Sequence, residues 1–272
     1  MTGKIQQLRD FLRPLTEKGT ALAFSGGVDS SLLLAVLAEM HQKSPFPFLL
    51  LNAVSTLQSS RDREAVQKIS AGYGFETKFL PCDVLALPQV RHNAPLRCYH
   101  CKKLLFETML SYAKLWGIHT ILEGSHSDDL KAYRPGRKAL EELGIISPLA
   151  RLGITKTEIR NMAAALKINT ARKPSAPCLA TRFDYGTELT EEILSRASAG
   201  EEFLHTLLPE TADLRLRVHG TLGRIEVAQE YFGLLLEHRE LIIKNLTLLG
   251  FEKITLDLAG FASGSFDGKL KE

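Results

Sequence analysis

The 272-residue sequence has no apolar run long enough to cross a membrane, and its first residues lack the apolar core of a secretion signal. We therefore expect a cytoplasmic protein with no membrane partner. The formal net charge is only +3, which does not indicate a nucleic-acid partner but leaves room for a local basic site. Internal repeats and low-complexity tracts are also missing, so a repeat architecture is excluded.

Cysteine is scarce, with one residue at each of the positions 82, 98, 101 and 178. In a reducing compartment, cysteines serve chemistry or metal binding more often than disulfide formation. The small cysteine set therefore predicts thiol chemistry or a metal site.

The composition, with 44% hydrophobic and 24% charged residues, is that of an ordinary globular protein, and the length suffices for two domains. Buried strands alternate with helical patterns in the first half of the chain. This alternation predicts an α/β fold with a parallel sheet covered on both faces. After Gly186 the alternation stops, which predicts a smaller α+β domain. The expected strands are at 20–24, 46–54, 76–81 and 118–124, and the expected helices are at 4–15, 31–43, 60–74 and 98–117.

A turn of small residues, SGGVDS at 25–30, joins the first strand to the second helix. Glycines let the backbone approach a ligand closely, and the free amides and dipole at a helix start favour an anion. Ser25, Ser30 and Ser31 add hydroxyl donors. The loop is not that of the P-loop NTPases, because it has no lysine. The alternative is an ordinary strand-to-helix turn with Asp29 or Ser30 as the helix cap.

The turn resembles the pyrophosphate-binding loop of the PP-loop ATP pyrophosphatases, which adenylate a carbonyl or carboxylate oxygen and release pyrophosphate. It does not choose among the branches of that superfamily, which include NAD and GMP synthetases, asparagine synthetases and tRNA thiolation enzymes. The resemblance implies that ATP and Mg²⁺ are bound by Ser25, Gly26, Gly27, Asp29 and Ser30.

The segment LEGSHSDDLKAYRPGR at 122–137 follows the fourth expected strand. Ligands gather at the carboxyl ends of parallel strands, so Glu123 and Asp128 are candidates for the nucleotide site. The alternative is a solvated surface loop.

Several separate motifs, taken in order, resemble the LarE family of ATP-dependent sulfur transferases. This resemblance implies a PP-loop domain at 1–180 and a substrate-binding or oligomerisation domain at 181–272. It also implies adenylation of a carboxylate on a pyridinium dicarboxylate mononucleotide, followed by displacement of AMP by sulfur to form a thiocarboxylate in nickel-pincer nucleotide synthesis. The motifs are SGGVDS (25–30), EGSHSDDLKAYRPG (123–136), SPLARLGITKTEIR (147–160), PCLATR (177–182), RLRVHGTLGRIEV (215–227) and TLDLAGFASGS (255–265).

The sulfur source is open at this point. In one branch of the family, the cysteine at the position of Cys178 gives up its own sulfur and becomes dehydroalanine. In the other branch, three cysteines bind a [4Fe-4S] cluster, and the free iron carries hydrosulfide supplied as sulfide or by a donor protein. The C-x-x-C pair of Cys98 and Cys101, together with Cys178, matches the cluster branch.

The C-x-x-C pair by itself has other interpretations, which are a redox pair, half of a zinc site, or two buried thiols. Cys82 follows the third expected strand and could complete a four-cysteine site. We favour a small buried thiol for Cys82, because a fourth thiolate would block the iron needed for sulfur transfer.

The segment DLRLRVHG at 213–220 alternates strictly, which predicts a strand with one apolar and one cationic face. Arginines on a solvated sheet face are common. The family resemblance instead implies that Arg215, Arg217 and Arg182 bind the substrate, whose phosphate suits the planar guanidinium fork. It also implies a metal site between subunits of a homo-oligomer, formed by Glu226 with Glu201 or Glu202.

Three rival functions remain. A tRNA thiolation enzyme would need a substantial basic surface or an RNA-binding module. An amidotransferase-type synthetase would use ammonia and need no C-x-x-C pair. A nucleotide-sensing protein without catalysis would need neither Asp29 nor Cys178.

Overall fold

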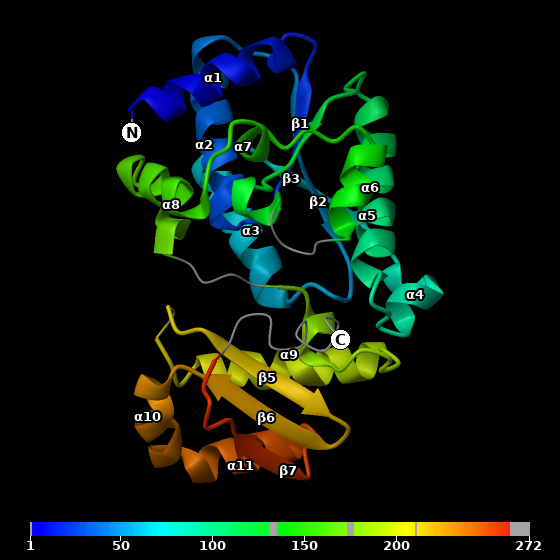
Figure 1. Cartoon of the computed structure of the whole chain (residues 1–272), viewed down its shortest axis with the longest axis vertical. Coiled ribbons are helices and arrows are strands. Elements are labelled where there is room, and N and C mark those ends of the chain that lie inside the picture. Colours follow the sequence, from blue (N-terminus) through cyan, green and yellow to red (C-terminus); the bar gives the residue numbers. More distant parts are fainter. Residues whose placement is uncertain (1, 131–134, 173–176, 210, 262–272) are drawn as a thin grey trace. The chain divides into compact units, whose positions relative to one another are not determined.

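The computed structural model describes residues 2–130, 135–172, 177–209 and 211–261 (Figure 1). The chain forms two compact units. The first unit contains 1–55, 62–87 and 96–173, and the second contains 56–61, 88–95 and 174–272. Compared with the predicted limit at 180/181, the second unit thus starts earlier, includes Cys178 and takes in two short segments from the first half of the chain. Parts of two family motifs, 131–134 and 262–265, lie outside the described residues.

The first unit contains a four-stranded sheet in which every neighbouring pair is parallel, as the strand-helix alternation predicted. The strand order is β3-β2-β1-β4. Thr20 of β1 pairs with Phe48 of β2, so the first two strands begin in register. The strands are β1 (Thr20–Ala23), β2 (Phe48–Val54), β3 (Thr77–Pro81) and β4 (Ile121–Leu122).

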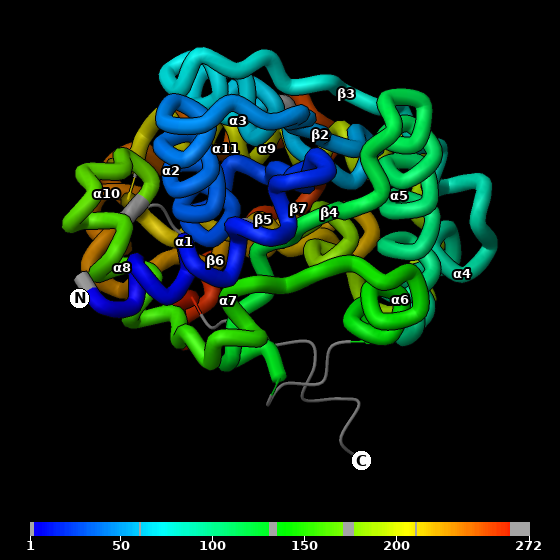
Figure 2. Tube along the Cα trace, turned by 90° about the horizontal axis from the view of Figure 1, so that it is seen from above, coloured from blue at the N-terminus to red at the C-terminus, as the bar shows by residue number. Residues whose placement is uncertain are grey.

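Helices cover both faces of this sheet. On β1, Leu22 belongs to one buried cluster and Ala21 to another, because successive side chains of a strand point to opposite faces. The cluster of Leu22 includes side chains of α1 (Thr2–Thr16), α2 (Val28–Lys43) and α8 (Lys156–Ala165), and that of Ala21 includes side chains of α5 (Arg97–Lys114) and α6 (Gly136–Glu142). In Figure 2, α5 and α6 lie together and α1 crosses α2. The remaining elements are α3 (Ser60–Gly72), η1 (Val84–Ala86), η2 (Ser127–Leu130), α7 (Pro148–Arg151) and η3 (Asn169–Arg172).

The second unit contains a three-stranded sheet of order β5-β6-β7, as expected for a small α+β domain. The pair β5/β6 is antiparallel and β6/β7 is parallel. Helix α9 packs on β5 so closely that a Cβ at Gly200 would lie 2.4 Å from Leu216 Cδ2. The elements are α4 (Pro88–Arg91), η4 (Leu179–Arg182), α9 (Glu191–His205), β5 (Leu214–His219), β6 (Leu222–Val227), η5 (Gln229–Tyr231), α10 (Phe232–Glu237), α11 (Arg239–Leu248) and β7 (Lys253–Leu256).

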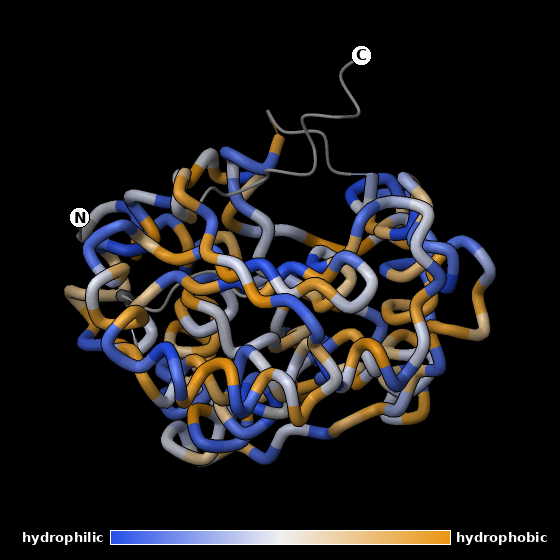
Figure 3. The backbone as a smooth tube through the Cα atoms, turned by 90° about the horizontal axis from the view of Figure 1, so that it is seen from below, coloured by the Kyte–Doolittle hydropathy of each residue, from blue (hydrophilic) through white to orange (hydrophobic). Residues whose placement is uncertain are grey.

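Asn93 joins the short segment 88–95 to the rest of the second unit. Its buried side-chain amide donates to the carbonyls of Ala180, Phe183 and Asp184. Apolar and polar stretches alternate at short intervals along the coloured part of the trace (Figure 3), and none of the described helices is long and apolar enough to span a membrane.

Candidate active site

The loop between β1 and α2 is shaped by its glycines and serines. Gly26 has φ +71°, a left-handed conformation that disfavours any side chain, and a Cβ there would lie 3.1 Å from Val66 Cγ2. Ser25 Oγ lies 3.2 Å from Ser30 Oγ, and Ser30 Oγ donates to the carbonyl of Gly27. These contacts fix the loop in one conformation.

The start of α2 is suited to bind an anion. Its N-cap residue is Gly27, and no side chain caps the helix. The predicted alternative, with Asp29 or Ser30 as the cap, is therefore wrong. Helix-start amides without a capping side chain are the groups that bind phosphate in other nucleotide-binding folds.

Asp29, in the first turn of α2, forms an ion pair with Lys156, the first residue of α8. Lys156 Nζ donates to both carboxylate oxygens of Asp29, at 2.7 Å each. The backbone amide of Lys156 donates to Asp128 Oδ2 at 2.7 Å. Lys156 therefore connects two of the residues predicted for the nucleotide site.

Glu123 is buried at the end of β4, where its carboxylate organises the following loop. It accepts hydrogen bonds from the amide and hydroxyl of Ser125, at 2.9 Å each, and from the hydroxyl of Ser147. Next to it, Gly124 lies directly against α2, since a Cβ there would lie 3.1 Å from both Asp29 Cβ and Ser30 N. The loop after β4 thus reaches the phosphate-binding turn, and the alternative of a plain solvated loop does not describe residues 123–129.

The four cysteines form no disulfide and fall in both units. Cys98 and Cys101 lie near the start of α5, three positions apart, so they share one helix face. Cys178, in the second unit, is exposed just before η4. These thiols fit the donor chemistry of an iron-sulfur cluster. Cys82 Sγ lies 3.6 Å from the carbonyl oxygen of Leu80 and is half-buried.

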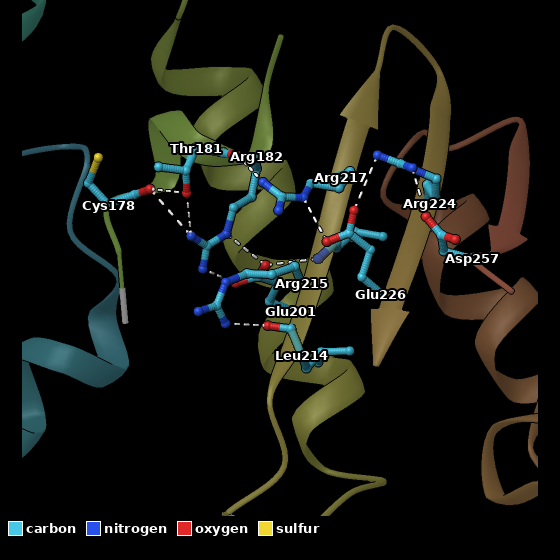
Figure 4. Close-up of polar contacts among 11 residues, drawn as sticks. Cys178, Thr181, Arg182, Glu201, Leu214, Arg215, Arg217, Arg224, Glu226 and Asp257 are labelled. Atoms are coloured by element: carbon cyan, nitrogen blue, oxygen red, sulfur yellow. Dashed lines mark hydrogen bonds and ion pairs between the residues drawn. The ribbon is translucent and has the colours of Figure 1, made fainter. Parts of the chain in front are cut away.

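The loop that carries Cys178 is held by a buried ion pair (Figure 4). Arg182 makes two parallel hydrogen bonds of 2.8 Å to Glu201 on α9. Its remaining Nη1 donates to the carbonyls of Pro177 and Cys178, at 2.9 and 3.3 Å, and to Thr181 Oγ1. In Figure 4 the sulfur of Cys178 points away from this pair.

A second buried ion pair lies beside the first. Arg217 Nε donates to Glu226 Oε2 at 3.0 Å, and Arg217 Nη1 donates to the carbonyl of Thr181. Glu226 also pairs with Arg224, which in turn binds Asp257 at 2.7 Å. We refer to Arg182, Arg215, Arg217, Glu201 and Glu226 as the arginine cluster.

The alternative of a solvated arginine face on β5 is wrong, because Arg215 and Arg217 are only 6% and 5% exposed. The η4 segment lies against this face, since Arg217 donates to the carbonyl of Thr181, whereas α9 packs against Leu216 on the opposite face of β5. Burial lowers the pKa of Arg215 to about 10, with the charge of Arg182 contributing, so Arg215 stays cationic near neutral pH. Its guanidinium lies 5.1 Å from the ring centroid of Phe261.

The metal site predicted at Glu226 and Glu202 stays a prediction. Both carboxylate oxygens of Glu226 already bind arginines, whereas Glu202 is exposed, accepts a hydrogen bond from Ser198 and lines a pocket of about 400 Å³ with Leu179. No group of three or more His, Cys, Asp or Glu side chains that could hold a metal ion occurs among the residues that the structure describes.

Two residues of these sites were not predicted from the sequence. Lys156 lies in a motif that was noticed only for its family resemblance. His205, one turn after Glu201 on α9, has its pKa lowered by burial and by Arg61, which favours a neutral imidazole. Its buried Nδ1 has no hydrogen-bond partner in the described part of the chain. The spacing of four from Glu201 was the available signal.

Comparisons with known proteins agree with this architecture. A PP-loop domain model matches residues 1–131. The chain is 32% identical to an uncharacterized protein of Synechocystis sp. over 99% of both chains. It is 30% identical to pyridinium-3,5-bisthiocarboxylic acid mononucleotide synthase of Lactiplantibacillus plantarum, over 92% of this chain and 89% of that enzyme. A tRNA-cytidine(32) 2-sulfurtransferase of Stenotrophomonas maltophilia is 31% identical over only 41% of this chain and 37% of its own.

The parallel sheet, the SGGVDS turn and the family match define a PP-loop protein that binds ATP. Within that class, the near-full-length similarity to the Lactiplantibacillus plantarum enzyme shows that the chain belongs to the LarE family. The protein is therefore an ATP-using sulfur transferase, as the sequence motifs predicted.

Proposed function

We propose that the protein converts a carboxylate of pyridinium-3,5-biscarboxylic acid mononucleotide into a thiocarboxylate. The observation that carries this proposal is the similarity over nearly the whole chain to an enzyme named for the bisthiocarboxylic product. In the first step a substrate carboxylate oxygen attacks the α-phosphorus of ATP, and pyrophosphate leaves. In the second step sulfide attacks the acyl carbon, and AMP leaves with the carbon-oxygen bond electrons.

The first unit supplies the residues for ATP. The loop amides and the hydroxyls of Ser25 and Ser30 bind the phosphates, and Asp29 offers a carboxylate to Mg²⁺, which prefers oxygen ligands. Glu123 and Asp128 orient the adjoining loop. All these groups lie near one helix start, where the dipole also favours anions.

The second unit supplies a cation for the substrate. Arg182 and Arg217 are each engaged by a carboxylate and by backbone carbonyls. Arg215, cationic and buried beside Arg182, donates from Nη1 to the carbonyl of Leu214 and has its guanidinium over the ring of Phe261, and we assign it the main role in binding the substrate phosphate. Arg182 and Arg217 then contribute mainly by fixing the segment 177–182.

Cys98, Cys101 and Cys178 hold a [4Fe-4S] cluster in this proposal, with sulfide or a donor protein as the external source. Such a cluster, when bound, supplies hydrosulfide at the iron that lacks a cysteine ligand. Support comes from the C-x-x-C pair on one helix face and from the exposed Cys178. Cys82 stays outside this set because a fourth thiolate would block the iron that carries hydrosulfide.

The deciding experiment combines iron analysis with intact-protein mass spectrometry. Anaerobically purified protein should contain about four irons per chain, as a [4Fe-4S] centre requires. Cys98→Ala, Cys101→Ala and Cys178→Ala should each lose iron, whereas the matched Cys82→Ala should not. With sulfide supplied, the wild-type protein should turn over repeatedly with unchanged mass.

The sacrificial route gives a different result. One turnover would then lower the chain mass by that of H₂S and leave dehydroalanine at position 178, and Cys98→Ala would be nearly silent. That outcome would replace the cluster by Cys178 as the sulfur source and leave the substrate assignment standing. Thiolation of tRNA, with no activity on the mononucleotide, would overturn the substrate assignment. Because part of the chain matches a tRNA sulfurtransferase, tRNA is assayed as a substrate beside the mononucleotide.

A further inference from the structure

His205 is a half-buried histidine of the second unit to which the proposed reaction gives no role. It lies on α9 one turn after Glu201, so the two side chains share a helix face. Its Nδ1 atom is buried and has no hydrogen-bond partner among the described residues. We propose that His205 belongs to the substrate-phosphate site and takes up a proton from solvent when a phosphate monoester binds there. The inference deepens the proposed function and rests on it, since it concerns the same site.

Charged side chains from four elements act on the imidazole of His205, and all of them belong to the second unit. They are Arg61 at the start of α3, Arg182 in η4, Glu201 on α9 and Arg215 on β5. The last three lie close together in Figure 4, where both carboxylate oxygens of Glu201 are bound by Arg182. Asp213 adds a carboxylate that acts on Arg215. Three guanidinium groups thus stand against two carboxylates, so the surroundings of His205 have an excess of positive charge.

In the ligand-free protein these surroundings favour the neutral form of His205. Burial lowers the pKa of the imidazole first, and the charges of Arg61, Arg215 and Arg182 lower it further, whereas Glu201 acts in the opposite direction. A neutral imidazole accepts a hydrogen bond at one nitrogen and donates from the other. Because a buried polar atom without a partner is costly, a ligand that supplies a partner for this ring is favoured.

A phosphate dianion bound at Arg215 reverses the electrostatic balance at the imidazole. Its negative charge compensates the repulsion between the guanidinium groups and a protonated ring, so the pKa of His205 rises. The ring then takes up one proton from solvent, and the imidazolium donates a charge-assisted hydrogen bond to a phosphate oxygen. Arg215, with a pKa of about 10, is cationic both before and after binding near neutral pH, so it does not supply or take up this proton.

The test is calorimetry of the full chain in two buffers of different ionisation enthalpy, at a pH of about 7.5, where a phosphate monoester is a dianion. The ligands are pyridinium-3,5-biscarboxylic acid mononucleotide and nicotinamide mononucleotide, which has the ribose phosphate but no ring carboxylate. The wild-type protein should take up about one proton with either ligand, because both carry the phosphate. Its affinity should therefore fall as the pH rises above about 7.5, by up to about tenfold per pH unit.

Three variants isolate the contribution of His205. His205→Gln should take up no proton and bind both ligands at least about tenfold more weakly, the range expected for one charged contact. His205→Arg carries a permanent cation, so it should bind both ligands more tightly than His205→Gln, without proton uptake. The matched control is His119→Gln, which removes an exposed histidine of the first unit and should keep the wild-type proton count.

The outcomes separate this inference from the proposed function. Binding without proton uptake in the wild type, or equal uptake in His205→Gln, overturns the inference and leaves the substrate assignment standing. Binding with the expected uptake but without formation of a thiocarboxylate supports the inference and overturns the proposed function. If neither mononucleotide binds, both are overturned. If His205→Gln fails to fold, NMR of the ring nitrogens of His205 in the wild-type protein decides, because a ring whose protonation state is the same with and without ligand contradicts the inference.

Discussion

The phosphate-binding turn at 25–30 and the arginine cluster both suit an anionic ligand. They differ in how far apart in the sequence their stabilising partners lie. The turn is made by neighbouring residues, and its shape depends on the left-handed backbone of Gly26. Two buried arginines of the cluster depend on a carboxylate from another element, Arg182 on Glu201 and Arg217 on Glu226. The turn therefore keeps hydrogen-bond donors available for a ligand, whereas most hydrogen-bond donors of the arginine cluster are already bound to protein groups.

Because of this difference, substitutions in the turn should change ligand affinity, and substitutions in the arginine cluster should change the free energy of unfolding. A substitution in the turn should mainly lower the affinity for ATP, because the loop is small and partly exposed. A residue of the arginine cluster that loses its partner leaves a buried charge, which is a large cost to the folded state. The predictions below test this contrast from the largest expected effect to the smallest.

The largest effect is expected for Glu201→Ala. It removes the carboxylate that binds both Arg182 and the amide of Leu216, and a buried pair broken in this way costs about 3–5 kcal/mol of unfolding free energy. The measurement is the urea midpoint followed by fluorescence and circular dichroism. The adjacent Glu202→Ala, on an exposed side chain, is the control and should change stability by no more than about 0.5 kcal/mol. Equal effects of the two would contradict the role of the buried pair.

Gly26→Val should abolish most ATP binding. The branched side chain is strained at φ +71° and collides with Val66, so the turn cannot keep its shape. An affinity loss of at least about tenfold is expected, the effect of losing one charge-assisted phosphate contact. At Gly27, where an added Cβ lies 3.5 Å from Ser25 Oγ, an alanine should be tolerated better. Unchanged ATP affinity in Gly26→Val would remove the turn from the nucleotide site.

Arg215→Ala should weaken the binding of the mononucleotide by about 1.5–3 kcal/mol, because one charged contact to phosphate is lost. The affinity for ATP should stay unchanged. Arg217→Ala should weaken the same substrate and also lower stability, since it leaves the buried Glu226 with one arginine fewer. Calorimetry with each ligand and a parallel melting curve distinguish the two variants. A drop in ATP affinity as large as that for the substrate would contradict the division between the units.

The smallest effect concerns the surface pair of Lys4 and Glu158. The pKa of Glu158 is lowered to about 2, first by its hydrogen bond to Lys4 and then by the amide of Thr155. Its contribution to stability is therefore present above the ordinary glutamate pKa and is lost as the pH falls toward 2. In Lys4→Met, an NMR titration of the Glu158 carboxyl should move its midpoint upward. An unmoved midpoint would assign the shift to the capping box alone.

Much of the first unit was predictable because its signals are local. Short apolar runs and helical hydrophobic patterns placed β1 to β4 and the main helices between them, and Gly26 marked the tight turn. The burial of Arg215 and Arg217 was left open by the sequence, because alternation along a strand shows which residues share a face but not whether another element covers that face. Here the η4 segment and Phe261 lie over it, with Arg217 donating to the carbonyl of Thr181 and Arg215 over the ring of Phe261.

The sequence by itself determined the parallel α/β unit, the family and the phosphate-binding turn, since each depends on residues close together in the chain. The tertiary structure alone decided which charges meet. It placed Lys156 on Asp29 and Glu201 on Arg182, pairs that neither periodicity nor motif spacing predicts. The physical reason is that ion pairing depends on distances in space, and burial sets how much each pair stabilises the folded state.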